Sequence, residues 1–198
     1  MSISIQGVPA LSWSNGTGIA SVDGDALLLT ASARTDWTND AFGGAQQHGA
    51  TSLGFESTGD FALSARVGVR SVRTTFDAAV LAIWGDRDHW AKLCFEFSPQ
   101  GEAMIVSVVT NEYSDDCNST VVAGDLAYLR VTRSGQGWAF HSSIDGVEWT
   151  FVRVFRLSWD GPVSVGFMAQ APNGEECVAA FDEIEYGTTV TADFRDGS

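Results

Sequence analysis

The chain has 198 residues and a formal net charge of −14, with 25 acidic residues against 11 Lys and Arg. Because the few basic residues are scattered, the positive patch that attracts nucleic acid or an anionic membrane is missing, and we expect neither partner. The N-terminal residues lack the basic region and the apolar stretch of a signal peptide, and no apolar run approaches the roughly 18 residues of a membrane span. These features predict a cytoplasmic protein.

Short apolar runs bounded by turn residues recur along the chain, and no long segment has helical periodicity. This pattern predicts an all-β sandwich of two antiparallel sheets, with ten to twelve strands in Greek-key or jelly-roll topology. We expect one domain over residues 1–187, followed by a polar, loose tail over 188–198. The expected strands are, in chain order, 26–32, 51–55, 61–69, 78–84, 89–97, 102–110, 126–132, 137–144, 147–154, 163–170 and 178–186.

Residues 34–49 form a long irregular segment rich in Gly, Asn and Gln. Long loops on a rigid sandwich are where ligand contacts concentrate. An aromatic ring can pack on the C–H face of a sugar, so Trp37 in this segment and Trp84 beside a later turn are candidates for stacking. His48, in the same segment as Trp37, is a candidate to contact ligand hydroxyl groups.

Residues 75–110 predict three consecutive antiparallel strands, with turns at 85–88 and 98–101. The first strand, 78–84, is almost wholly apolar, so we expect it to be covered on both faces. In the second strand Lys92, Cys94 and Glu96 share one face by the period of two. A lysine and a glutamate therefore point out of the middle of a sheet, about 13 Å apart along the strand.

Two explanations of these charges stay open. Lys92 and Glu96 can belong to an ion-pair network within the sheet, with Asp77 as the partner of Lys92 and Arg130 or Arg66 as the partner of Glu96. The same charges can instead line a ligand groove, because binding clefts collect charged residues with shifted pKa values. After this region, residues 111–118 (NEYSDDCN) are predicted to form a polar loop.

Ten short motifs occur in an order and spacing that resemble a known family. They are TDW at 35–37, His48, GDF at 59–61, TFD at 75–77, WxKxxxE at 90–96, SVVT at 107–110, YSD at 113–115, LRxxR at 129–133, SIDG at 143–146 and MxxxP at 168–172. Over about residues 11–186 the chain is similar to the domain-of-unknown-function family that includes the regulation-of-enolase proteins. The chain departs from that family after Asp77, where AAVL replaces QAGL, and after Asp115, where Asp116 replaces Trp.

This resemblance implies the concanavalin A-like lectin/glucanase jelly roll and no agreed activity. Related jelly rolls bind or cleave glycans in the groove of the concave sheet. The first hypothesis is accordingly a module without catalysis that binds a carbohydrate or small polar metabolite on that sheet. Its candidate ligand contacts are Trp37, His48, Trp84, Lys92, Glu96, Thr110 and Arg130.

Two further hypotheses belong to other classes. One is a glycoside hydrolase-like enzyme that uses Glu96 with Asp77 or Asp115, because glycosidases need two carboxyl groups at a fixed separation. The ExDxxE pattern of the related glucanases does not surround Glu96, so the sequence favours binding over catalysis. The other is a regulatory module whose partner is a metabolic enzyme, as the family name implies.

The sequence assigns no cofactor and no metal ligand. Three acidic pairs, Asp23 with Asp25, Asp86 with Asp88 and Asp115 with Asp116, offer the hard oxygen ligands that calcium prefers. None of them completes the DxDxDG pattern of a calcium loop. A structural calcium ion, which related jelly rolls often carry, is therefore compatible with the sequence but not indicated by it.

Overall fold

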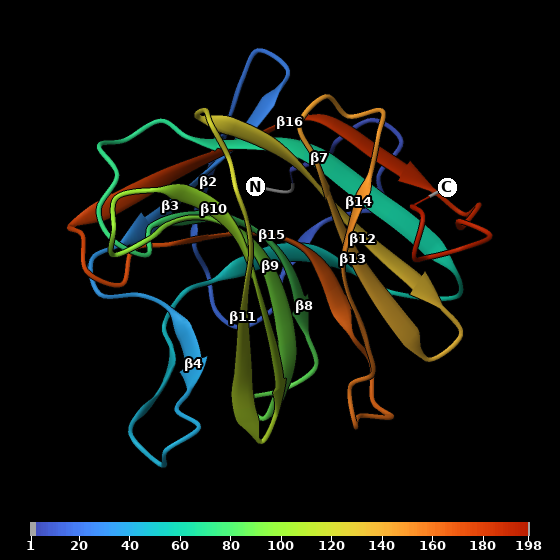
Figure 1. Ribbon diagram of the computed structural model, residues 1–198, viewed down its shortest axis with the longest axis horizontal. Helices are drawn as coiled ribbons and strands as arrows, with labels where there is room; N and C mark the ends of the chain where they lie inside the picture. The colour runs from blue at the N-terminus through green and yellow to red at the C-terminus, as the bar shows by residue number, and fades with distance from the viewer. Residues whose placement is uncertain (1–2, 198) are drawn as a thin grey trace.

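The computed structural model describes residues 3–197, which form two seven-stranded antiparallel sheets and a separate hairpin (Figure 1). The first sheet has the strand order β1 (Ser12–Trp13), β6 (Ser52–Glu56), β15 (Ser164–Gln170), β8 (Ala78–Trp84), β9 (His89–Phe97), β10 (Ala103–Asn111) and β11 (Tyr113–Val121). The second has the order β14 (Thr150–Phe155), β13 (Gly137–Ser143), β12 (Leu126–Ser134), β7 (Phe61–Val69), β16 (Glu176–Gly187), β3 (Ala26–Ser32) and β2 (Ile19–Asp23). The hairpin pairs β4 (Trp37–Asn39) with β5 (Gln46–His48).

The main apolar core lies between the two sheets. On β7, Leu63, Ala65 and Val67 are fully buried and face this core, while Arg66 on the opposite face reaches the surface. On β9, Phe95 faces the same core, as the period of two predicts. The two-residue alternation fixes the register of each strand, because a slip by one residue would exchange the buried and exposed faces. The predicted all-β sandwich is confirmed.

Two segments that were predicted to be irregular are strands. Residues 34–49 contain the β4–β5 hairpin, and residues 113–121 form β11, the edge strand of the first sheet. Nearly all of β11 is exposed, so the apolar alternation that identifies a half-buried strand is absent from its sequence. These additions, with the two-residue β1 and the short β2, bring the strand number above the predicted ten to twelve.

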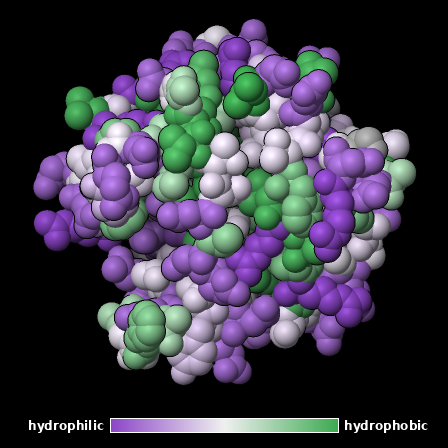
Figure 2. All heavy atoms as spheres, viewed as in Figure 1, coloured by the Kyte–Doolittle hydropathy of each residue, from purple (hydrophilic) through white to green (hydrophobic). Residues whose placement is uncertain are grey.

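The hairpin covers the outer face of the first sheet and projects beyond it (Figure 1). Its inner end is buried, with Trp37 packed against Ala78 and Val80 of β8, whereas Phe42 at its tip is 99% exposed. Figure 2 shows this tip as a small apolar cluster on a largely hydrophilic surface. The hairpin therefore explains why β8 is apolar on both faces, which confirms that prediction.

The C-terminal residues lie on the outer face of the second sheet. His141 Nε2 is 2.7 Å from the carbonyl oxygen of Phe194, and Arg130 donates a hydrogen bond of 2.6 Å to the carbonyl oxygen of Gly197. These contacts correct the expectation of a loose tail. The described residues include no helix that is long and apolar enough to cross a membrane.

The pairing of β6 with β15 requires glycine where the two backbones are closest. A Cβ atom on Gly166 would lie 2.2 Å from the carbonyl oxygen of Leu53, whereas one on Gly137 would meet nothing closer than 3.4 Å. Gly166→Ala should therefore lower the free energy of unfolding by at least about 2 kcal/mol. Gly137→Ala is the matched control and should change it by less than about 1 kcal/mol. Equal urea midpoints for the two variants would contradict this explanation.

Candidate functional site

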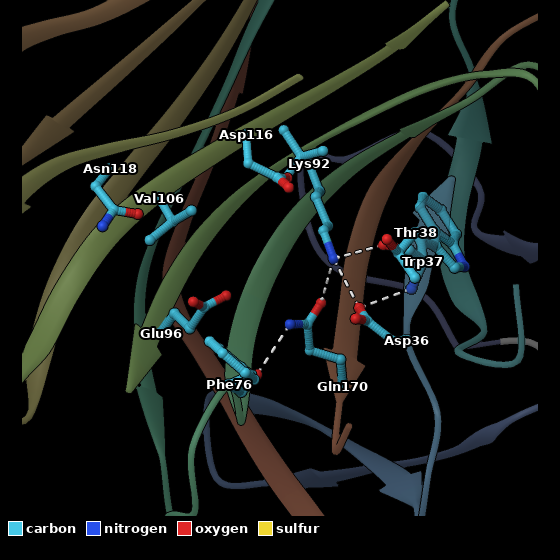
Figure 3. Close-up of a pocket in the computed structure, with 11 residues that line it drawn as sticks. Asp36, Trp37, Thr38, Phe76, Lys92, Glu96, Val106, Asp116, Asn118 and Gln170 are labelled. Carbon is cyan, nitrogen blue, oxygen red and sulfur yellow. Dashed lines mark hydrogen bonds and ion pairs between the residues drawn. The ribbon is translucent and has the colours of Figure 1, made fainter. Parts of the chain in front are cut away.

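The outer face of the first sheet carries a pocket of about 240 Å³ beside the hairpin (Figure 3). It is lined by Asp36, Trp37, Thr38, Phe76, Lys92, Glu96, Val106, Val108, Asp116, Asn118 and Gln170. The strand register brings these side chains together, because Lys92 pairs with Val108 and Val108 pairs with Asp116 across three adjacent strands. The pocket thus lies over β9, β10 and β11, with the chain before β4 as one wall.

Lys92 holds that wall in place. Its side chain is buried, and its Nζ donates to Asp36 Oδ1 at 2.7 Å, to the Trp37 carbonyl at 2.8 Å and to Gln170 Oε1 at 2.9 Å. Burial by itself lowers the pKa of the ammonium, but the negative groups around it, Asp36 foremost, together outweigh burial, and the net pKa is raised. Lys92 is therefore charged, and all three of its protons are used inside the protein.

The same network extends to Phe76 on the opposite rim. Gln170 Nε2 donates to the Phe76 carbonyl at 2.9 Å, and the Phe76 N–H donates to the Phe97 carbonyl at 2.7 Å. Phe76 has a φ of 71°, a left-handed conformation that a residue with a large side chain rarely adopts. Such strain persists only where surrounding contacts enforce it, and it concentrates at functional sites. Its ring remains 37% exposed at the pocket.

Glu96 is the more buried of two carboxyl groups in the pocket lining that have no partner among residues 3–197. The residue is only 8% exposed, yet its carboxyl group forms no hydrogen bond or ion pair with any of residues 3–197. Figure 3 shows this carboxyl group turned toward the space between the labelled side chains. Desolvation raises its pKa to about 7, and the charge of Lys92 offsets only part of that rise. At neutral pH Glu96 therefore exchanges between a proton donor and a carboxylate.

Asp116 supplies a second carboxyl group from β11. It lies on the same face of the sheet as Lys92, and Figure 3 shows it on the Lys92 side of the pocket. Partial exclusion of water raises the pKa of Asp116 above its ordinary value, although Lys92 opposes this effect. Asn118, two residues further along β11, adds an amide with both donors and acceptors.

The predicted stacking role of Trp37 and Trp84 is not supported by their environment. Trp37 is fully buried, its Nε1 donates to the Ala50 carbonyl at 2.7 Å, and its ring centre lies 4.6 Å from that of Trp84. His48 Nε2 lies within hydrogen-bond distance of Asn39 Oδ1, at 2.8 Å, and the His48 ring packs edge-on against Trp84. These three residues support the hairpin, because burial of the large rings gives more free energy than exposure in a loop. Trp37 borders the pocket, while the other two do not line it.

Thr110 and Arg130 are also outside the pocket. Thr110 is buried and its Oγ1 lies 2.9 Å from Ser114 Oγ. Arg130 belongs to the second sheet, where its guanidinium lies 4.3 Å from the centre of the Trp149 ring. Arg130 therefore cannot pair with Glu96. Arg66, the other predicted partner of Glu96, also belongs to the second sheet and pairs with Asp182 at 2.7 Å.

The two carboxyl groups predicted to act with Glu96 face elsewhere. Asp77 lies one residue before the position opposite Glu96, so its side chain points to the other face, where Oδ2 accepts a hydrogen bond from the Thr74 N–H at 2.8 Å. Asp115 points away from the pocket and pairs with Arg153 at 2.9 Å. Both predictions of a partner for Glu96 are wrong by one position in the strand alternation. Lys92 also has Asp36, and not Asp77, as its partner.

Eight residues that line the pocket were not predicted as ligand contacts, namely Asp36, Thr38, Phe76, Val106, Val108, Asp116, Asn118 and Gln170. A signal was present for Asp116 and Asn118, because a strand over 113–121 places them on the same face. Asp36 comes from a part of the chain 56 residues before Lys92, so no local pattern links the two.

Within residues 3–197 no group of three His, Cys, Asp or Glu side chains has an arrangement that could hold a metal ion. Of the acidic pairs that the sequence offers to calcium, Asp86 accepts hydrogen bonds from the Asp88 N–H and from His89 through Oδ1. A structural calcium ion, which the sequence allows without indicating it, remains untested.

The chain belongs to the family described as Protein of unknown function (DUF1349), whose model matches residues 13–189. The family membership that the ten sequence motifs predicted is therefore confirmed. No curated protein matches the chain in sequence.

Solved structures place the fold among jelly rolls of the lectin and glucanase type. A functionally unknown protein from Saccharomyces cerevisiae is similar to this chain, with a TM-score of 0.80 and 27% identity over 91% of this chain and 97% of that one. The GH43 protein BlXynB from Bacillus licheniformis matches with a TM-score of 0.64 and 14% identity over 85% of this chain and 38% of its own. A legume lectin-like domain from Entamoeba histolytica matches with a TM-score of 0.56 and 11% identity over 91% and 90% of the two chains.

Lys92→Met should be strongly destabilising, because it removes the cation that pairs with the largely buried Asp36 carboxylate, to which only the Trp37 N–H then donates, and it takes a donor from the Trp37 carbonyl and from Gln170. We expect a loss of about 3 to 5 kcal/mol in the free energy of unfolding, measured with urea. Arg70→Met is the control, because Arg70 forms an exposed ion pair with Asp23, and it should cost less than about 1 kcal/mol. A similar small loss in both variants would contradict the structural role of Lys92.

Glu96→Gln should stabilise the protein at high pH. The pKa of Glu96 is raised from 4.5 to about 7 on folding, so the native state binds more protons and loses stability as pH rises through this window. The glutamine variant lacks that loss. Its free energy of unfolding should equal that of the natural protein near pH 4 and exceed it by up to about 3 kcal/mol at pH 8. Glu148→Gln, on an exposed loop, should show no such pH-dependent gain, and an equal gain there would contradict the assignment.

Proposed function

We propose that this protein binds a small carbohydrate or carbohydrate-like metabolite in the pocket over β9, β10 and β11. The observation that carries the proposal is Glu96, a residue that is only 8% exposed and whose carboxyl group has no partner among residues 3–197 and opens to the pocket. A buried polar group without a hydrogen bond costs free energy. Glu96 bears part of that cost through desolvation of its carboxylate, and a ligand that donates to Glu96 would offset it.

The chemistry of the lining suits a sugar ring. Glu96 and Asn118 offer acceptors and donors for hydroxyl groups, as Asp116 does at the side of β11. The exposed ring of Phe76 offers an apolar surface for the C–H face of the sugar. It takes the stacking role that was predicted for Trp37 and Trp84.

The size of the pocket limits the ligand. A volume of about 240 Å³ lies just below the roughly 300–1,000 Å³ of pockets that enclose drug-sized ligands. We therefore infer that one sugar unit, and not an oligosaccharide, is enclosed. The similar folds of a GH43 protein and a legume lectin-like domain support carbohydrate as the ligand class by analogy of fold alone.

A second candidate function is hydrolysis of a glycoside by Glu96 with Asp116. It is favoured by the pKa of about 7 for Glu96, because a general acid works best when its pKa is near the operating pH. Asp116 replaces Asp77 and Asp115 as the second carboxyl group. Turnover of aryl glycosides that is lost in both Glu96→Gln and Asp116→Asn would support it, whereas turnover that survives either change would exclude this pair.

A thermal-shift panel of monosaccharides tests the binding proposal. A ligand at 100 times its Kd adds about 2.7 kcal/mol of stability, which raises Tm by about 5 to 10 °C for a domain of this size. The shift should disappear in Glu96→Gln and fall in Phe76→Ala. Phe42→Ala, which removes an exposed ring that does not line the pocket, should keep it. A panel with no shift, or a shift that Glu96→Gln retains, would overturn the proposal.

A further inference from the structure

We propose that the preferred ligand carries a positive charge, as a protonated amine on a sugar ring does, so that the pocket selects amino sugars over neutral sugars. This inference rests on the proposed function and specifies the ligand of the same pocket. It depends on how the charges in the lining are paired.

The cation of the pocket is already neutralised. Lys92 is the only basic side chain in the lining, and its three donors are directed to Asp36, Trp37 and Gln170. It therefore has no proton left to donate to a ligand carboxylate or phosphate. A ligand of negative charge would meet carboxyl groups without a compensating donor.

Two carboxyl groups remain for the ligand. Glu96 and Asp116 have no hydrogen bond or ion pair within residues 3–197, and they line the pocket from β9 and β11, with β10 between them and with Asp116 level with Lys92 (Figure 3). With Asp36 and Lys92 included, the ionised lining holds three carboxylates against one ammonium, a formal charge of −2. An unpaired carboxyl group that is more than nine-tenths buried distinguishes Glu96 from an ordinary acidic surface cluster.

Other basic groups near the sheet are directed away from this space. The Arg73 guanidinium lies 4.6 Å from the Phe95 ring centre, and Phe95 belongs to the core between the sheets. Arg153 pairs with Asp115, which faces away from the pocket. Neither arginine lines the pocket. Lys92 and Arg73 thus act on Glu96 only through space, and a cation in direct contact with its carboxylate is left to the ligand.

An ammonium group fits this arrangement because it has three donors and no acceptor, whereas the unpaired groups are acceptors when ionised. Hydrogen bonds between two ionised groups are about twice as strong as those between neutral groups. The raised pKa of Glu96 supports the same conclusion, since desolvation outweighs the stabilising charges of Lys92 and Arg73 in the free protein. A bound ammonium would supply a cation in direct contact and favour the ionised form.

Matched sets of sugars that differ only at carbon 2 test the inference. Glucose, glucosamine and N-acetylglucosamine form one set, and galactose, galactosamine and N-acetylgalactosamine form a second. Calorimetric titration of the full chain should give the free amine a Kd about 10- to 100-fold lower than the hydroxyl member, the range expected of a charge-assisted hydrogen bond. The acetylated member, which has lost the charge, should bind no better than the neutral sugar.

The variants separate the inference from the proposed function. Glu96→Gln should abolish the preference for the amine, while Glu148→Gln should keep it. Equal binding of the neutral and amine members, abolished by Glu96→Gln, would overturn the charge selection and leave the carbohydrate pocket standing. Binding by no member of either set would overturn both. A preference for the amine that survives Glu96→Gln would also overturn the assignment, because it would place the charge contact elsewhere.

Discussion

The buried ammonium of Lys92 is the constraint on which the outer face of the first sheet depends. A charge without solvent must be surrounded by acceptors, and here they come from the chain before β4, from the β4 backbone and from β15. This requirement holds the hairpin against the sheet, so that Trp37 is buried over β8 and β9. Through Gln170 it also fixes the carbonyl of Phe76. The pocket exists because these segments, distant in sequence, share one cation.

Once Lys92 is fully paired, Glu96 is left as a destabilising group. Its desolvated carboxyl group and the left-handed backbone of Phe76 both cost free energy, and the two residues line the same pocket. A fold under selection for stability alone would replace Glu96 by an apolar residue such as the Val106 nearby. Glu96 and Phe76 both line this pocket. That is the physical reason to regard the pocket as the place where a ligand binds, in preference to the packed rings of Trp37, Trp84 and His48.

Local patterns predicted the parts of the structure that repeat with a fixed period. The two-residue alternation placed Lys92 and Glu96 on the outer face and explained the doubly covered β8, as observed. It failed where the strand itself was not recognised. Because residues 111–118 were predicted to be a loop and the strand over 113–121 was not recognised, Asp115 was chosen where Asp116 faces the pocket. Trp37 shows the other limit, since no local pattern reveals that a hairpin folds its ring onto a distant sheet. The Lys92 pairing with Asp36 is likewise tertiary.

An NMR titration tests the central claim most directly. It follows the chemical shift of the Glu96 carboxyl carbon as pH is varied, in protein labelled at glutamate. The titration midpoint should be about 7 in the free protein, and lower when an amino sugar is bound, because a nearby cation favours the carboxylate. A midpoint near the ordinary glutamate value of about 4.3, unchanged by any sugar, would show that Glu96 is solvated or paired. That result would contradict the unpaired carboxyl group on which the proposed binding site depends.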